Sequence, residues 1–130
     1  MKVPIFSLKV EDKKLKKKLL KSVERVLDHG KILLGPEVDL FEKKVAEYSG
    51  KKYAIGMASG SSALYIALKS LGIGSGDEVI TTPFSWIITG NAIVETGAKP
   101  IFVDIEDDFN INPFLIEKAI TKKTKAIVPV

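Results

Sequence analysis

Small and hydroxyl-bearing residues crowd a point where a short apolar stretch passes into a helical pattern. They occupy Ser59–Ala63, within the longer run Ile55–Tyr65. Small side chains let a ligand approach the backbone closely, and the first N–H groups of a helix have no intrahelical acceptor. The helix dipole also favours negative charge at that end. We therefore consider Gly60, Ser61 and Ser62 a candidate phosphate site, with a simple helix cap as the alternative.

A second group that could do chemistry follows the next apolar strand pattern. Phe84, Ser85 and Trp86 come after it, and this Trp is the only one in the chain. Its planar ring either stacks on a flat ligand or fills the core of the domain. A phosphate site beside an aromatic platform would suit a flat phosphorylated cofactor. Asp104, after a third strand pattern, either holds a ligand hydroxyl or, as we favour, caps the following turn.

The common phosphate-binding signatures and metal-binding patterns are missing from the sequence. The small-residue turn lacks the Gly-Lys-Ser/Thr ending of a P-loop and the three spaced glycines of the dinucleotide fingerprint. The chain has no Cys, and its lone His29 cannot assemble a metal site by itself. We therefore expect no metal, and we interpret His29 as a favourable charge at the carboxyl end of a helix.

Composition and charge narrow the class of protein. A length of 130 residues with 45% apolar residues suits one domain with a core. The net charge is +4, but the lysines gather in one early segment where apolar residues recur at helical spacing. This indicates the exposed face of an amphipathic helix rather than a nucleic-acid site. Without a membrane span or a secretory signal, we expect a cytoplasmic protein with no membrane partner.

Two helices are predicted ahead of every strand. The first runs from about Asp12 to Asp28 and ends at Gly30, which can take the left-handed cap conformation. The second begins at Pro36 and stops at Gly50. From Tyr53 onward, strand and helix patterns alternate. Strands are predicted near 53–57, 78–82, 100–104 and 126–130, and helices near 61–71, 85–96 and 113–120.

This alternation predicts an α/β fold with three layers, in which helices cover both faces of a mostly parallel sheet. Ligands of such sheets bind at the carboxyl ends of the strands, where the candidate residues fall. The last strand is apolar up to Val130, and no helix follows to cover it. We therefore expect the chain to be the first part of a larger protein.

A series of ordered motifs runs along nearly the whole chain from about Pro4. They are Gly35-Pro36-Glu37-Val38 with Phe41-Glu42, Ala58-Ser59-Gly60-Ser61-Ser62-Ala63-Leu64, Gly76-Asp77-Glu78-Val79-Ile80, Thr82-Pro83-Phe84-Ser85-Trp86, Asn91-Ala92-Ile93, Gly97-Ala98-Lys99-Pro100, Phe102-Val103-Asp104-Ile105, Ala119-Ile120-Thr121, Lys123-Thr124-Lys125-Ala126-Ile127 and Val128-Pro129-Val130. In this order they resemble the amino-terminal part of the DegT/StrS family, which are pyridoxal-phosphate-dependent sugar aminotransferases.

The resemblance implies a fold type I enzyme, with residues 1–130 forming part of its pyridoxal-phosphate-binding large domain. Two leading helices would cover about 12–50 and strand/helix units about 53–130. The implied reaction transfers an amino group from glutamate or glutamine to a nucleotide-linked keto sugar in a homodimer, with pyridoxamine 5'-phosphate as the aminated cofactor. Gly60, Ser61 and Ser62 would hold the cofactor phosphate, and Trp86 would stack on the pyridine ring. The loop between Gly30 and Gly35 would lie near the substrate.

The catalytic residues are not expected in this chain. By the resemblance, the Lys that binds the cofactor covalently and the carboxylate that keeps its ring nitrogen protonated follow the point matching Val130. A His in place of that Lys would instead indicate a pyridoxal-phosphate-dependent sugar dehydratase of the same family. A non-enzymatic α/β nucleotide-binding or interaction module is the third hypothesis.

Overall fold

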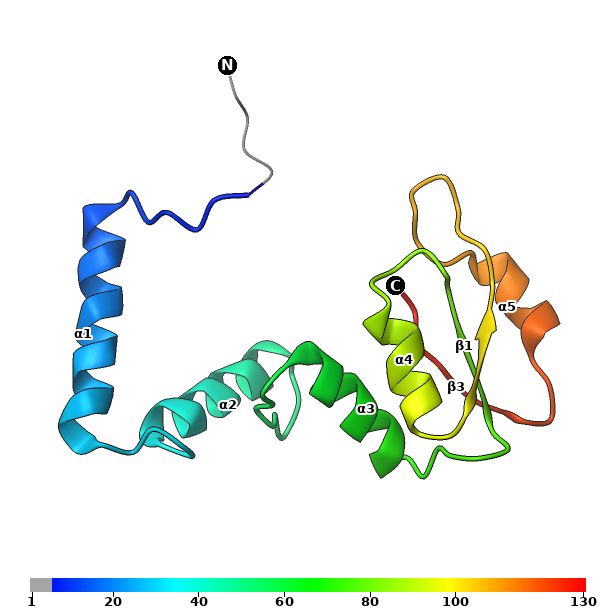
Figure 1. Ribbon diagram of the computed structural model, residues 1–130, viewed down its shortest axis with the longest axis horizontal. Coiled ribbons are helices and arrows are strands. Elements are labelled where there is room, and N and C mark those ends of the chain that lie inside the picture. Colours follow the sequence, from blue (N-terminus) through cyan, green and yellow to red (C-terminus); the bar gives the residue numbers. More distant parts are fainter. Residues whose placement is uncertain (1–5) are drawn as a thin grey trace, which may run out of the picture. The chain divides into compact units, whose positions relative to one another are not determined.

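The computed structural model describes residues 6–130, which divide after Gly56 into two compact units. The first, which we call the helical unit, contains α1 (Lys13–His29) and α2 (Pro36–Tyr48) (Figure 1). The second, the α/β unit, contains α3 (Gly60–Ser70), β1 (Glu78–Thr81), α4 (Ile88–Glu95), β2 (Lys99–Phe102), α5 (Pro113–Ala119) and β3 (Thr124–Ile127). No helix within residues 6–130 is long and apolar enough to span a membrane.

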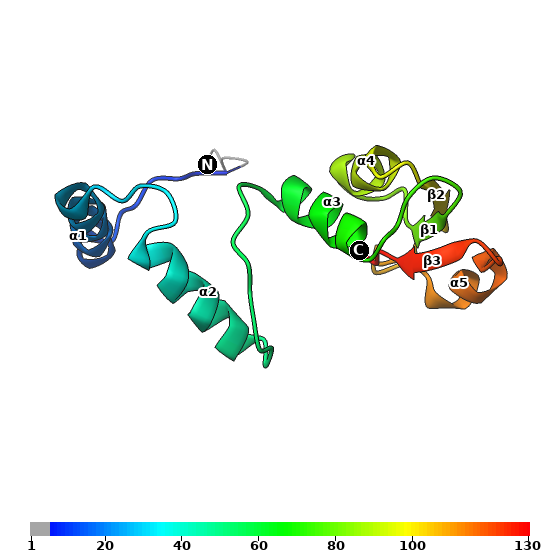
Figure 2. The ribbon, with the colours of Figure 1, turned by 90° about the horizontal axis from the view of Figure 1, so that it is seen from below.

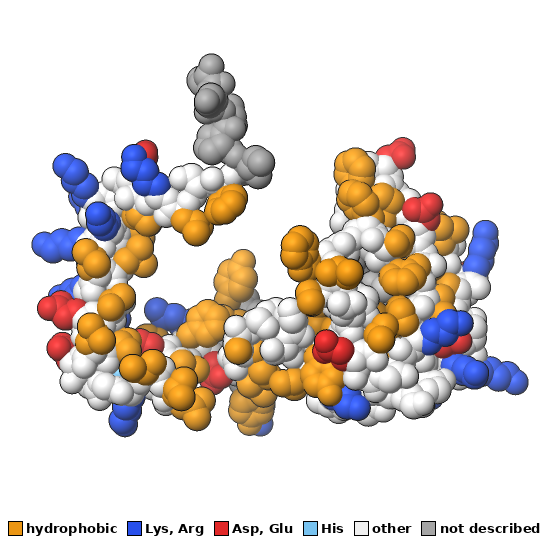
Figure 3. Space-filling view, in the orientation of Figure 1, with side chains coloured by type: hydrophobic (Ala, Val, Ile, Leu, Met, Phe, Trp, Pro, Cys, Tyr) orange, Lys and Arg blue, Asp and Glu red, His pale blue; other side chains and the backbone are white. Residues whose placement is uncertain are grey.

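Both ends of α1 are capped, and the cap at Gly30 is the one that the sequence predicts. The Asp12 carboxylate accepts hydrogen bonds from the N–H groups of Lys14 and Leu15, at 2.7 and 3.3 Å. Gly30 ends the helix with φ of 68°, a left-handed conformation that a residue without Cβ adopts freely. Lysines gather on one side of this helix and apolar side chains on the other, in agreement with the predicted amphipathic pattern (Figure 3).

His29 makes more contacts than its position at the end of α1 predicts. Its Nδ1 accepts a hydrogen bond from the N–H of Lys31 at 3.0 Å, and its Nε2 lies 3.1 Å from the carboxylate of Glu37 in α2. Because Nδ1 is an acceptor, Nε2 carries the proton that is donated to Glu37. Gly35, the N-cap of α2, is buried, and a Cβ there would lie 2.5 Å from the Lys31 carbonyl oxygen. The loop between the two helices is therefore fixed at both of its ends.

The sheet of the α/β unit is parallel, with the strand order β2-β1-β3. The central strand places Ile80 opposite Ile101 on one side and Ile127 on the other. Residues of α3 and α4 pack on one face of the sheet, and residues of α5 pack on the other (Figure 2). The predicted three-layer α/β arrangement is confirmed.

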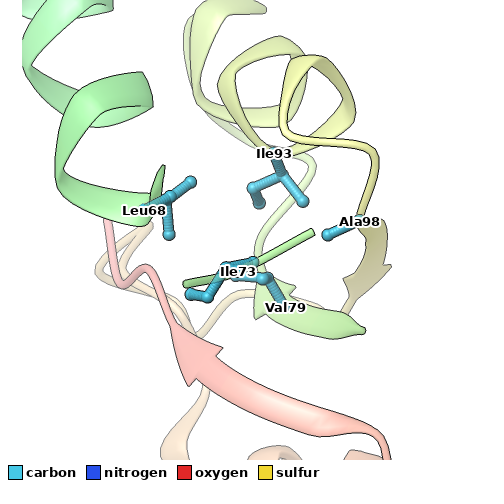
Figure 4. Packing of buried hydrophobic residues seen from close by; sticks show 5 residues of the cluster. All are labelled: Leu68, Ile73, Val79, Ile93 and Ala98. Carbon is cyan, nitrogen blue, oxygen red and sulfur yellow. The ribbon is translucent and has the colours of Figure 1, made fainter. Parts of the chain in front are cut away.

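The core consists of two clusters, one on each face of the sheet. Val79 belongs to the first and Ile80 to the second, and both are 0% exposed. Neighbouring residues of a strand point to opposite faces, so a strand covered on both sides is apolar at successive positions. The first cluster contains Leu68, Ile73, Val79, Ile93 and Ala98 (Figure 4), and the second contains Ile80, Val103 and Ile111 with the partly buried Ile101, Leu115, Ile116 and Ala119.

The predicted strand at 53–57 is wrong for this structure. Residues 53–57 form no strand, and the side chains of Tyr53 and Ile55 are 73% and 74% exposed. A strand exists only when a neighbour accepts and donates its ladder hydrogen bonds, and no segment of residues 6–130 does so for this one. The sheet accordingly has three strands within the described residues, instead of the four predicted.

Two other boundaries also differ from the prediction. The helix expected from about residue 85 begins at Ile88, because the N–H of Ser85 bonds to the carbonyl of Pro83 in a tight bend. The last strand, expected at 126–130, lies at Thr124–Ile127. Its pairing starts early because the N–H of Glu78, the first residue of β1, bonds to the carbonyl of Lys123.

Replacing Ile93 with Ala should lower the free energy of unfolding by about 2–5 kcal/mol, because it leaves a cavity in the first cluster. Its neighbour Val94 is 56% exposed, so Val94→Ala should change stability by no more than about 0.5 kcal/mol. Urea unfolding of the purified variants measures both values. Equal losses in the two variants would contradict the assigned core.

Candidate functional site

The small-residue turn forms the amino-terminal end of α3. Ser59 is the N-cap, and its Oγ accepts the N–H of Ser62 at 3.1 Å and lies 3.0 Å from the Ser62 hydroxyl. The Ser59 carbonyl accepts the N–H of Ala63 at 3.1 Å. The N–H groups of Gly60 and Ser61 have no acceptor within residues 6–130. One serine therefore caps the helix while two N–H groups stay available.

Open space lies next to those two N–H groups. A Cβ added to Gly60 would meet no atom within 4 Å, and Ser61 and Ser62 are both partly exposed. Two free donors, two hydroxyls and the positive end of a helix dipole fit an anionic group such as a phosphate. That Gly60, Ser61 and Ser62 hold a phosphate stays a prediction. The N-cap role of Ser59 was not assigned from the sequence, although a serine directly before a helical pattern is a recognisable capping signal.

Trp86 lies in the loop between β1 and α4. Its side chain is 79% exposed, so within the described residues it is not part of the core. It borders a hollow of about 310 Å³ between this loop, α4 and β2. The residues that line the hollow are Thr82, Pro83, Ser85, Trp86, Ile87, Thr89, Gly90, Asn91, Val94, Pro100 and Phe102. An exposed indole face at the rim of an apolar hollow is suited to stacking on a planar group.

Hydrogen bonds hold both ends of the loop that carries Trp86. The buried hydroxyl oxygen of Thr82 accepts the N–H of Phe84 at 3.3 Å. The hydroxyls of Ser85 and Thr89 lie 2.9 Å apart, and the Trp86 carbonyl accepts the Thr89 N–H at 3.0 Å. These contacts join the loop to the end of β1 and to the first turn of α4. The path of the backbone around Trp86 is therefore well defined.

The two candidate groups belong to the same unit and the same end of the sheet. Ser59–Ser62 begin α3 and Trp86 shortly precedes α4, and these two helices pack against each other. Each helix runs toward the amino end of the strand that follows it, so its own amino end lies toward the carboxyl ends of the strands. No hydrogen bond joins the two groups within residues 6–130.

Asp104 closes a turn, as we favoured from the sequence. One oxygen of its carboxylate accepts the N–H of Ile105 at 2.8 Å, and its carbonyl accepts the N–H of Asn112 at 2.9 Å. An antiparallel bridge between Ile105 and Ile111 continues this turn. The residue therefore has a structural role within the described chain.

The α/β unit thus has three layers, an open helix amino end at Gly60 and an exposed aromatic ring, Trp86, toward the carboxyl ends of its strands. Residues 13–130 match the DegT/DnrJ/EryC1/StrS aminotransferase family, and the chain belongs to this family. It is 43% identical over 129 residues to the UDP-2-acetamido-2-deoxy-3-oxo-D-glucuronate aminotransferase of Pseudomonas aeruginosa. That match covers 98% of this chain and 36% of the relative, so the chain spans about a third of its length.

Solved structures of the family show the same fold. The crystal structure of S. venezuelae DesV in complex with a ketimine intermediate has a TM-score of 0.92 and 42% identity, and the match covers 98% of this chain and 34% of that one. The structure of ntda from Bacillus subtilis with bound cofactor PMP has a TM-score of 0.85 and 41% identity, covering 90% and 27%. The predicted family and fold type are confirmed.

Replacing Ser59 with Ala should lower the free energy of unfolding by about 0.5–2 kcal/mol, because α3 loses its N-cap. Ser70→Ala, at the other end of the same helix, is the control, since the Ser70 hydroxyl bonds only to the exposed carbonyl of Ala67. Ser59→Asp should restore most of the loss, because Asp is an equally good N-cap. Urea unfolding curves of the three variants test this order.

Proposed function

We propose that the protein is a pyridoxal-phosphate-dependent aminotransferase that moves an amino group from glutamate or glutamine to a nucleotide-linked keto sugar. Family membership and the names of its relatives support transamination over sugar dehydration, and one named relative acts on a UDP-linked sugar. A homologue bound to PMP supports the choice of cofactor. We also propose that the full-length enzyme is a cytoplasmic homodimer. In this proposal the loop between α1 and α2 lies near the substrate. The observation that carries the proposal is the open amino end of α3, where the N–H groups of Gly60 and Ser61 have no acceptor within residues 6–130.

In this proposal, the amino end of α3 holds the cofactor phosphate. The N–H groups of Gly60 and Ser61 donate to its oxygens, together with the Ser61 hydroxyl. The Ser59 Oγ already accepts the N–H of Ser62, and its proton can be donated to the Ser62 oxygen 3.0 Å away. The hydroxyl proton of Ser62 is then left for the phosphate. Ser59 thereby orients a binding residue without touching the ligand itself.

Trp86 provides the surface on which the cofactor ring lies. The exposed indole would cover one face of the pyridine ring, exclude water from that face and fix the orientation of the ring. When bound, pyridoxal phosphate supplies an electron sink for the transfer of the amino group. We assign the covalent attachment to none of the lysines of this chain, because none lies in the context that the family resemblance requires.

Ser61→Ala and Trp86→Ala should each weaken pyridoxal-phosphate binding in the full-length enzyme. Loss of the Ser61 hydroxyl removes a bond to a charged group, worth about 1.5–3 kcal/mol, which is roughly a ten- to hundredfold rise in the dissociation constant. Loss of the indole removes the stacked face. Equilibrium dialysis followed by cofactor absorbance measures both constants.

Matched controls separate these effects from general damage. Ser70→Ala removes a hydroxyl from the opposite end of α3, and Phe114→Ala removes an aromatic ring that is 78% exposed on α5. Both controls should bind the cofactor as the wild type does. Unchanged affinity in Ser61→Ala and Trp86→Ala together would refute the assignment of the site.

The reaction is tested with the full-length protein, a UDP- or dTDP-linked keto sugar and glutamate or glutamine. We expect an amino sugar and the corresponding oxo acid in equal amounts, because the amino group passes from donor to sugar. Loss of water from the sugar without consumption of the amino donor would instead identify a dehydratase. Mass spectrometry of the sugar product distinguishes the two outcomes.

A further inference from the structure

Phe109 has an unfavourable backbone conformation that its own burial does not explain. Its φ is 69°, in the left-handed region that bulky residues rarely occupy. Its side chain is 62% exposed, so little hydrophobic burial offsets the strain. Strain of this kind persists where the surrounding structure enforces it, and often at sites that position other groups.

The ring of Phe109 stacks on the ring of Phe84. Their centroids are 5.5 Å apart and the ring planes are inclined by 28°. Phe84 lies two residues before Trp86, in the loop between β1 and α4, whereas Phe109 lies in the turn between β2 and α5 (Figure 1). The stack therefore joins the loop that carries Trp86, between β1 and α4, to the turn between β2 and α5.

The turn that carries Phe109 is held by several hydrogen bonds. The carbonyl of Glu106 accepts the N–H of Phe109, and the N–H of Glu106 donates to the carbonyl of Asn110, both at 2.9 Å. The Asp108 carboxylate accepts the backbone N–H of Asn110 at 3.0 Å and its side-chain amide at 2.8 Å. These two bonds from Asn110 lower the pKa of Asp108, so the carboxylate stays ionised and bonded at neutral pH.

The base of the same turn is anchored in the core. The N–H of Val103 bonds to the carbonyl of Thr81 at 2.9 Å, and the N–H of Ile111 bonds to the carbonyl of Val130 at 2.8 Å. Both Val103 and Ile111 are buried members of the second core cluster. Phe109 is thus presented from a base anchored in the core, and its ring lies against Phe84 of the loop that carries Trp86.

We propose that Phe109 is a positioning residue that holds the Trp86 loop through its stack on Phe84, and so fixes the plane on which the cofactor ring lies. The predicted effect on cofactor binding rests on the proposed function. The contact by which Phe109 holds the Trp86 loop, which we call the clamp, lies within the α/β unit and can be measured without the cofactor. In this proposal the strained backbone of Phe109 accompanies the placement of its ring on Phe84.

The test compares Phe109→Gly with Phe109→Tyr in the full-length enzyme. Glycine removes the ring and adopts the positive φ without steric strain, so the substitution adds no backbone strain at this position. Tyrosine keeps the stacked ring. In cofactor-free protein, amide hydrogen exchange over residues 82–89 should be faster in Phe109→Gly and unchanged in Phe109→Tyr. Equal exchange rates over residues 82–89 in the two variants would show that the Phe109 ring does not hold the Trp86 loop.

The cofactor-bound enzyme gives the second measurement. Phe109→Gly should raise the pyridoxal-phosphate dissociation constant roughly two- to tenfold, the range expected from losing one aromatic pair. It should also reduce the induced circular dichroism of the bound cofactor, which reports the orientation of its ring. Phe114→Ala, an exposed Phe of α5 with no stacked partner within residues 6–130, should change neither value.

Trp86→Ala, measured in parallel, separates the inference from the proposed function. If Trp86→Ala releases the cofactor while Phe109→Gly leaves affinity and circular dichroism unchanged, the positioning role is wrong and the proposed function stands. If Trp86→Ala has no effect, the proposed platform is wrong, and the positioning role at the cofactor is wrong with it. Faster exchange of residues 82–89 would then support only the clamp between the two loops.

Discussion

Burial of β1 on both faces is the constraint on which the rest of the α/β unit depends. Val79 and Ile80 are fully buried in opposite clusters, so helices must cover both sides of this four-residue strand. Its two neighbours are parallel to it, and parallel neighbours require crossover connections, which α4 and α5 supply. The position of each helix therefore follows from the need to cover one apolar strand.

The same strand also sets the direction of the loop that carries Trp86. β1 ends at the buried Thr81, and the buried Thr82 follows it. The hydroxyl of each has a hydrogen-bond partner. The Thr81 hydroxyl donates to the carbonyl of Val128 at 2.8 Å, and the Thr82 hydroxyl oxygen accepts the Phe84 N–H. Because a buried hydroxyl without a partner is costly, these bonds fix where the backbone leaves the sheet. The exposure of Trp86 is a consequence of this exit, since the loop turns away from the core before the indole is reached.

Local signals in the sequence were sufficient for the helices and insufficient for contacts between distant segments. Asp12, Gly30 and Pro36 mark helix ends by their own chemistry, and the structure places them there. The apolar pattern at 53–57 predicted a strand, but a strand also needs a partner, which the described residues do not provide. The stack of Phe84 on Phe109 joins residues from two loops that are far apart in the sequence. No sequence pattern predicts that a Phe adopts a left-handed conformation, as Phe109 does. Such pairs become visible only when the fold brings the two loops together.

At α3, the sequence left a helix cap and an anion site as alternatives, and the observed cap does not exclude the anion site, because the two would use different N–H groups. A cap serves only some of the unpaired N–H groups of a helix end. Ser59 takes the N–H of Ser62, and the N–H groups of Gly60 and Ser61 remain unpaired within residues 6–130. Had Ser59 bonded to one of these earlier groups, the helix end would have had fewer donors facing the open space at Gly60. Capping at the third position therefore stabilises the helix and is compatible with the phosphate site that we propose.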